Sequence, residues 1–174
     1  MKTLLVLFTI LIILLSGCGV FNLGDFVLPD DYDIEFIKTV KTLNTPEKIC
    51  NYMDDNFTYF CDPNKAILSP YQSWLIKEVD CDDMSTFATS AANYHNYPAY
   101  QIYIYFKGTL IYHALAIYLE NDKYTYSSNQ TYYPLYTSSF NDIVLDYFKH
   151  DKREINYYEI FDYNMDLIEK IYAS

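Results

Sequence analysis

A cysteine at the start of a predicted helix is the first feature of this sequence that indicates chemistry. Cys81 stands in the segment Asp80-Cys81-Asp82-Asp83, directly before a helical stripe of apolar and small residues. Unpaired backbone N–H groups and the helix dipole stabilise a thiolate at such a position. The segment therefore predicts a nucleophile, and the alternative is an inert thiol packed under a sheet.

A histidine and a polar group follow where they can complete a catalytic set. His113 lies in the longest predicted strand, and residues 127–129 (Ser-Ser-Asn) close the next strand. A thiolate nucleophile needs an imidazole as base and acid, and the imidazole needs an acceptor that orients it. We predict that Cys81 and His113 form this pair, with an acceptor from 127–129. Taken alone, a histidine at this place is more often a satisfied core residue, and it is the order with Cys81 that favours a catalytic role.

This order of residues resembles the transglutaminase-like branch of the papain-type cysteine enzymes. The segment around Cys81 resembles that family's nucleophile motif, and His113-Ala114-Leu115 resembles its histidine motif. Residues 123–126 resemble the segment that leads to the third catalytic residue of the family. The resemblance covers roughly residues 45–130. This chain departs from the family pattern at Val79 and Leu115, where glycine and tryptophan are common.

The third catalytic position departs from the family pattern as well. The family usually carries aspartate there, and residues 124–132 contain none. Because asparagine orients the histidine in papain-type enzymes, the resemblance implies Asn129. Ser128 is the alternative, since a shift of one residue moves a side chain to the other face of a strand.

The resemblance implies an acyl-transfer enzyme that acts on a protein or peptide. Cys81 would attack an amide or ester carbonyl to give a thioester, which water or an amine would then resolve, so hydrolysis and transamidation both stay open. No cofactor is implied, and the spacing of the Asp, Cys and His residues does not favour a metal site. The alternative function is that of a catalytically inactive surface lipoprotein, which uses the same fold and a tyrosine-rich face to bind a partner.

The N-terminus predicts export. Lys2 precedes an apolar run over residues 4–15, and Leu15-Ser16-Gly17-Cys18 resembles the lipobox of bacterial lipoproteins. We therefore expect a signal peptide over 1–17, lipidation of Cys18, a tether over 18–33 and one domain over 34–174. This places the protein outside the cytoplasm, anchored to the cell membrane or the outer membrane. An ordinary secretory signal or an uncleaved anchor is the alternative.

Two further cysteines fit an exported protein. Cys50 and Cys61 lie ten residues or so apart in sequence, and an oxidising compartment permits a disulfide between them. Pairing them would leave Cys81 as the free thiol. The geometry of the fold decides whether the bridge forms.

Composition excludes several classes of protein. The chain has 174 residues, a formal net charge of −11, and 21 tyrosines but only 4 glycines. A hydrophobic content of 51% excludes a disordered chain. The acidic balance argues against nucleic acid or an anionic lipid surface as the main partner. The oligomeric state stays open.

The periodicity of apolar residues predicts the elements that position these groups. Helices come first in the chain and an antiparallel meander follows, which is typical of an α+β fold. The predicted helices cover 33–43, about 45–55, 82–94, about 140–148, and a final stretch from about residue 162. The predicted strands cover 57–60, 100–106, 110–119, 124–128 and 155–161, and the stretch from 62 to 70 is read as irregular.

Overall fold

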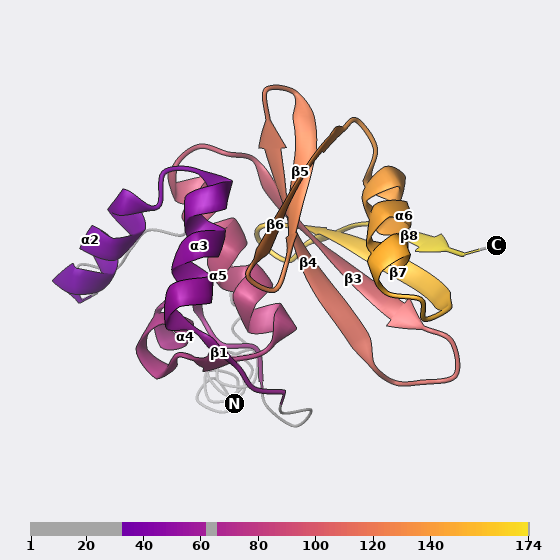
Figure 1. Ribbon diagram of the computed structural model, residues 1–174, viewed down its shortest axis with the longest axis horizontal. Coiled ribbons are helices and arrows are strands. Elements are labelled where there is room, and N and C mark those ends of the chain that lie inside the picture. The colour runs from indigo at the N-terminus through magenta and orange to yellow at the C-terminus, as the bar shows by residue number, and fades with distance from the viewer. Residues whose placement is uncertain (1–32, 62–65, 174) are drawn as a thin grey trace, which may run out of the picture.

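The computed structural model of the chain describes residues 33–61 and 66–173 (Figure 1). The predicted signal peptide, Cys18 and the tether up to residue 32 lie outside these residues. The N-terminal part of the described chain is a block of helices with one pair of short parallel strands. Its elements are α2 (Ile34–Thr42), α3 (Pro46–Asn56), β1 (Thr58–Tyr59), α4 (Pro70–Ile76), β2 (Glu78–Val79) and α5 (Cys81–Tyr94).

The C-terminal part is a six-stranded antiparallel sheet with one helix. The strands lie in the order β6-β5-β4-β3-β7-β8. The elements are β3 (Ala99–Phe106), β4 (Tyr112–Glu120), β5 (Lys123–Ser128), β6 (Thr131–Thr137), α6 (Phe140–His150), β7 (Ile155–Asp162) and β8 (Leu167–Tyr172). Helices followed by an antiparallel sheet confirm the predicted α+β class.

Local sequence signals set the helix boundaries. Thr45 caps α3 by accepting a hydrogen bond from the N–H of Lys48 at 3.3 Å, and Pro46 occupies the first helical position. Helix α5 begins after Asp80, and its end is followed by Asn96, which adopts a φ of 63°. Asparagine tolerates this left-handed conformation, so the chain can turn there into β3.

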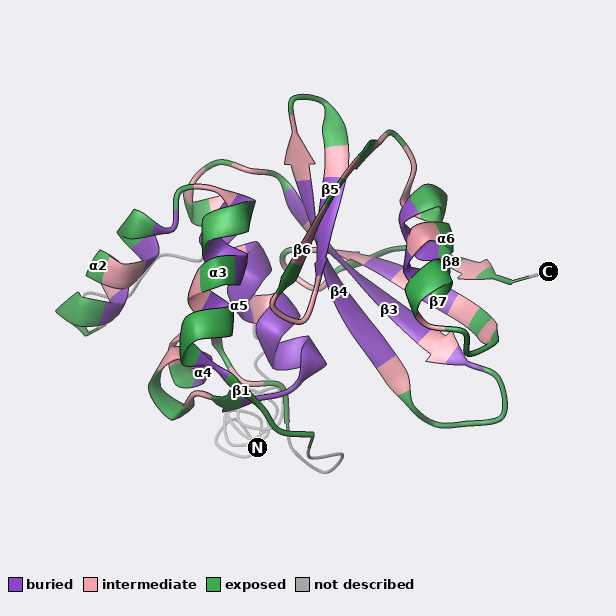
Figure 2. Ribbon diagram, in the orientation of Figure 1, coloured by how far each residue is buried: buried purple, intermediate pink, exposed green. Residues whose placement is uncertain are grey.

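The sheet is covered on both faces, and α5 and α6 lie on opposite sides of it (Figure 1). On one face, Ala116 and Tyr118 of β4 pack in the same cluster as α3 and α5. On the other face, Leu115 and Ile117 of β4 pack with residues of α6. Strand β4 is therefore buried on both sides, and Figure 2 shows buried residues along α5, β3 and β4.

Small side chains allow α5 to approach the sheet closely. Ala88, Ala91 and Ala92 are all buried in the cluster that α5 shares with β4. A larger residue at these positions would hold the helix away from the strands. The close approach fixes the first turn of α5, and with it Cys81, against β3 and β4.

The structure differs from the sequence predictions in four segments, of which the short strand β2 (Glu78–Val79) pairs with β1. Residues 70–76 form helix α4, because Ser69 and Gln72 build a capping box around Pro70. No strand is predicted from the sequence at residues 131–137, which contain Pro134. These residues form β6, and β6 lies at the edge of the sheet, where proline is tolerated.

The predicted final helix is wrong. The chain forms strand β8 instead, because it pairs with β7 in antiparallel register, for example Tyr158 with Ile171. Apolar residues in a short terminal segment suit either element, and the free edge of β7 decides between them.

Within 33–61 and 66–173, no helix combines the length and the apolar character needed to cross a bilayer.

Candidate functional site

The site around Cys81 begins with the cap of α5. Asp80 accepts a hydrogen bond from the N–H of Asp83, and Asp83 accepts one from the N–H of Asp80, at 3.4 and 3.3 Å. Asp83 also accepts a hydrogen bond from the N–H of Leu68 at 2.7 Å, so it braces the loop before α4. These contacts explain why the helix begins at Cys81, whose side chain is 8% exposed.

The surroundings of Cys81 favour the thiol over the thiolate. Burial raises the pKa of Cys81 to about 12, and the nearby carboxylates of Asp82 and Asp80 add to this effect. Hydrogen bonds from the backbone of Ala114 and Asp82 oppose it, but they are the weaker influence. The predicted activation by the helix N-terminus is therefore outweighed, and Cys81 is protonated at neutral pH.

Cys81 and His113 lie on opposite faces of the sheet. Ala114 shares a buried cluster with Cys81 and Tyr103 on the α5 face. Successive residues of a strand point to opposite faces, so His113 points to the α6 face. Two observations agree with this: His113 is paired in register with Ile104 of the α6-face cluster, and its ring stacks on Tyr147 of α6 at 5.2 Å.

The imidazole of His113 also makes a hydrogen bond to Ser128. A hydrogen bond of 2.9 Å joins Nε2 of the histidine to the hydroxyl oxygen of Ser128. Burial, helped by the charge of Arg153 and opposed by that of Asp151, lowers the pKa of His113 to about 4. The imidazole is thus neutral at pH 7 and held in the core.

Asn129 does not take the predicted third position. It lies in the turn between β5 and β6 with a φ of 51°, and its side-chain oxygen is buried without a hydrogen-bond partner among the described residues. The structure therefore brings His113 together with Ser128 but brings neither Asn129 nor Cys81 to the imidazole. The physical reason is the two-residue period of a strand, which separates His113 from Ala114 by the thickness of the sheet.

Tyr112 occupies the position on β4 that faces the start of α5. Its hydroxyl donates a short hydrogen bond to the carboxylate of Asp82, and burial together with this carboxylate raises the pKa of Tyr112. Further into the face, the side-chain oxygen of Gln101 accepts hydrogen bonds from Ser85 and Tyr103 at 2.8 and 3.4 Å. Among the described residues, the polar side chains of this face near Cys81 are therefore hydrogen-bonded to one another.

The three aspartates at this helix start also form the described group closest to a metal-binding arrangement. One carboxylate oxygen from each of Asp80, Asp82 and Asp83 lies within 4.8 Å of the others. Each carboxylate accepts a hydrogen bond from the chain itself. Two of these contacts belong to the cap of α5 and its neighbouring loop, and the third comes from the hydroxyl of Tyr112.

Comparison with known proteins gives no family. No family model matches the chain, and no curated protein matches it in sequence. Among solved structures, it is similar to LapG from Legionella pneumophila, with a TM-score of 0.46 and 12% identity over 80% of this chain and 75% of LapG. A likeness at this level says nothing about activity. The chemistry of this chain is decided by its own side chains.

The disulfide between Cys50 and Cys61, which the sequence left open, is not formed in the structure. Cys50 and Cys61 are both free thiols, and they differ in surroundings. Cys50 is 1% exposed and faces the hydroxyl of Tyr118, whereas Cys61 is exposed beyond β1. Helix α3 turns Cys50 into the core, whereas Cys61 is exposed, and each thiol is therefore in its own surroundings.

A row of tyrosines crosses the α5 face of the sheet, and the sequence did not reveal it. Tyr112, Tyr105, Tyr157 and Tyr172 are paired in register across β4, β3, β7 and β8. Their successive ring centroids lie 5.7, 4.4 and 5.7 Å apart. Each tyrosine occurs in a strand pattern, but only the pairing register aligns them. We call these four residues the tyrosine row.

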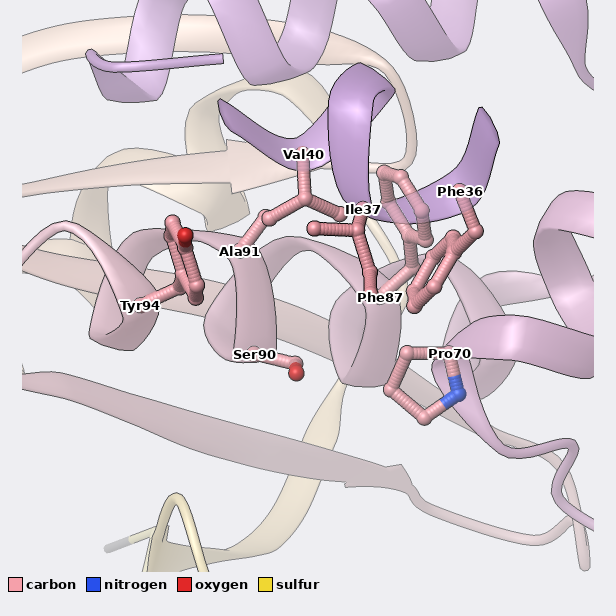
Figure 3. Close-up of a pocket in the computed structure, with 8 residues that line it drawn as sticks. All are labelled: Phe36, Ile37, Val40, Pro70, Phe87, Ser90, Ala91 and Tyr94. Atoms are coloured by element: carbon pink, nitrogen blue, oxygen red, sulfur yellow. The ribbon is translucent and has the colours of Figure 1, made fainter. Parts of the chain in front are cut away.

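A small apolar cavity lies between α2 and α5 (Figure 3). Its volume of about 10 Å³ is the space of one water molecule. The side chains of α2 point toward α5 in this view, and the cavity is an imperfection of helix packing. The lining residues are Phe36, Ile37, Val40, Pro70, Phe87, Ser90, Ala91 and Tyr94.

Proposed function

We propose that this chain is a binding module built on a transglutaminase-like, papain-type frame, without cysteine catalysis. In this proposal the protein is exported, anchored to the membrane through Cys18, and recognises a protein or peptide partner through the tyrosine row. One observation carries the proposal: Cys81 and His113 lie on opposite faces of the sheet.

Catalysis by the predicted pair would need a proton to pass directly between sulfur and imidazole. The sheet separates the two groups, since Ala114 faces Cys81 while His113 faces Tyr147. The pKa shifts of the two groups support the same conclusion as the geometry. A thiol with a pKa of about 12 and an imidazole with a pKa of about 4 are both uncharged at neutral pH, so no ion pair forms.

The tyrosine row has the properties of a contact surface. Tyr172 is 69% exposed, and the other three rings are partly exposed along the face. Tyrosine offers a rigid apolar ring with a polar tip, which suits protein interfaces. The nearby charges are paired within the chain, because the amine of Lys170 contacts Glu159 at 2.9 Å and lies 3.8 Å from the ring centre of Tyr157.

The reactivity of Cys81 toward iodoacetamide tests the absence of catalysis. Alkylation is followed by mass spectrometry of peptides, which separates Cys81 from the exposed Cys61 in the same sample. We expect Cys81 to react more slowly than Cys61 at neutral pH, and its rate to rise only in strong alkali. His113→Ala should leave the rate of Cys81 unchanged when the variant is folded.

The enzyme hypothesis predicts the reverse result. Fast alkylation of Cys81 at neutral pH, lost in His113→Ala, would establish an ion pair and overturn the proposal. Labelling of Cys81 by an activity-based thiol probe on intact cells would do the same, with Cys81→Ala as the control.

The contact face is tested by site-specific photocrosslinking in cells. A photoreactive phenylalanine analogue at Tyr105 or Tyr157 should give a discrete crosslinked product. The same analogue at Leu145, which is 54% exposed on α6, serves as the control. Products from the Leu145 position alone, or from no position, would contradict the assigned face.

A further inference from the structure

The turn between β3 and β4 carries the most exposed of the large apolar side chains that the structure describes. The hairpin projects at the lower right of Figure 1, and we call residues 107–111 the hairpin tip. Leu110 is 100% exposed, and its neighbour Ile111 is 61% exposed. Two adjacent apolar side chains held in water cost free energy, which contact with an apolar phase would recover.

The hairpin has no carboxylate of its own in an otherwise acidic chain. The sequence contains 23 aspartates and glutamates, but none of them lies between Asp83 and Glu120. The charged side chain of the tip is Lys107, whose amine lies 3.8 Å from a carboxylate oxygen of Glu154, the residue directly before β7. A carboxylate resists transfer to an apolar phase, whereas a lysine can bury its stem and keep its amine in water. The charge pattern of the tip therefore suits an apolar phase with a polar boundary.

The backbone of the tip satisfies part of its own hydrogen bonding. The N–H of Ile111 donates to the hydroxyl oxygen of Thr109 at 3.2 Å, and this hydroxyl donates to the carbonyl of Ile111 at 3.4 Å. The N–H of Lys107 donates to the carbonyl of Glu154 at 2.8 Å. Polar groups that are bonded within the protein cost less to take out of water than free ones. These contacts therefore lower the cost of moving the tip from water into an apolar phase.

The predicted anchor favours a lipid bilayer as this apolar phase, and this step rests on the membrane anchoring in the proposed function. A tether over 18–33 could span up to about 50 Å when extended, so it would hold the domain at the bilayer without fixing which edge faces the lipid. Exposed side chains would then decide the orientation. A net charge of −11 is repelled by anionic lipids, so the contact depends on apolar insertion and suits neutral phospholipids.

We propose that the hairpin tip inserts into the interface of the bilayer to which the chain is anchored. Leu110 and Ile111 enter the boundary between headgroups and acyl chains, which interfacial elements reach to a depth of about 5–10 Å. Lys107 stays at the level of the headgroups, where its amine meets phosphate oxygens. The insertion fixes the orientation of the domain on the membrane. The tyrosine row lies within the strands and not in the tip, so this contact is separate from the one assigned to a protein partner.

Fluorescence quenching by brominated lipids tests this inference. The full-length protein is purified from membranes and reconstituted in phosphatidylcholine vesicles, with and without bromine atoms on the acyl chains. The matched variants are Leu110→Trp and Leu145→Trp, which place an indole at an exposed leucine of the tip or of α6, and the emission of the native Trp74 is subtracted with the wild type. We expect bromine to remove about half or more of the added emission of Leu110→Trp, and about a tenth or less of that of Leu145→Trp. Circular dichroism confirms that both variants are folded.

Flotation of the same vesicles distinguishes failure of the tip from failure of the anchor. Protein that floats with the vesicles but shows equal quenching in the two variants would overturn the insertion and leave the anchor in place. Protein that does not float would overturn the anchor and the insertion together. In cells, a photoreactive phenylalanine analogue at Leu110 should give an adduct with phospholipid. A crosslink from this position to protein alone would assign the tip to a protein interface and overturn the inference.

Discussion

The imidazole of His113 stacks on the ring of Tyr147, with ring centroids 5.2 Å apart and planes inclined by 15°. This contact joins β4 to α6, and the hydrogen bond to Ser128 joins β4 to β5. Burial of a neutral imidazole costs little free energy, whereas burial of an imidazolium costs much more. His113 is therefore a core residue whose protonation opposes folding.

Acidification should destabilise the protein through His113. Its pKa is about 4 in the folded state and 6.5 ordinarily, so the unfolded chain binds the proton first as the pH falls. Stability is then lost from about pH 6.5 down to about pH 4, by up to about 3 kcal/mol. Urea unfolding across this range measures the slope, and His113→Phe should remove this part of it.

The control for this measurement is His150, which is exposed on α6. His150→Gln should keep the part of the slope that comes from His113, because it leaves the ring of His113 and its contacts with Tyr147 and Ser128 in place. An unchanged slope in His113→Phe would contradict the assignment of a buried, neutral imidazole.

Removal of the Tyr112 hydroxyl should destabilise the start of α5. Asp82 is 6% exposed and accepts a hydrogen bond from this hydroxyl, so Tyr112→Phe leaves a buried carboxylate with one donor fewer. We expect a loss of about 2 kcal/mol in the free energy of unfolding, measured by urea denaturation. Tyr172→Phe makes the same deletion at an exposed ring and should change stability by less than about 0.5 kcal/mol. Equal effects would show that the Asp82 contact contributes nothing.

The cap of α5 gives a third prediction. Asp80→Ala removes the acceptor for the N–H of Asp83 and should lower the free energy of unfolding by about 1–2 kcal/mol. Asp80→Asn keeps an acceptor oxygen and should lose clearly less. Thermal or urea unfolding compares the two variants. An equal loss in both would mean that the charge of Asp80, and not its hydrogen bond, stabilises the helix.

The cysteines should remain unpaired under non-reducing conditions. We expect rapid labelling of Cys61 by a thiol reagent and protection of Cys50, since Cys50 is 1% exposed and burial raises its pKa to about 11. Unfolding in urea should then expose Cys50 to the same reagent. A peptide that contains both residues joined by a disulfide, found by mass spectrometry of the oxidised protein, would contradict the structure.

Local sequence signals determined the helices that begin with a clear cap. The Thr45-Pro46 pair and the aspartates around Cys81 fix where α3 and α5 begin, because capping depends on residues within one turn. The class of the fold followed from the order of these helices and the later alternating segments. The contact of Asp83 with the N–H of Leu68, by contrast, joins residues fifteen positions apart and is set by the tertiary structure.

The partners of these residues were decided by the tertiary structure. A strand exposes alternate residues to opposite faces, so one position in register determines whether His113 or Ala114 meets Cys81. That register depends on packing of β3 and β4 between the helices α5 and α6, and no local pattern encodes it. Tertiary structure also decides the conformation of β8. Its apolar residues suit a helix or a strand, and hydrogen bonding to the edge of β7 selects the strand. The sequence by itself thus determined which residue types and elements are present, and only the assembled sheet decided which of them touch.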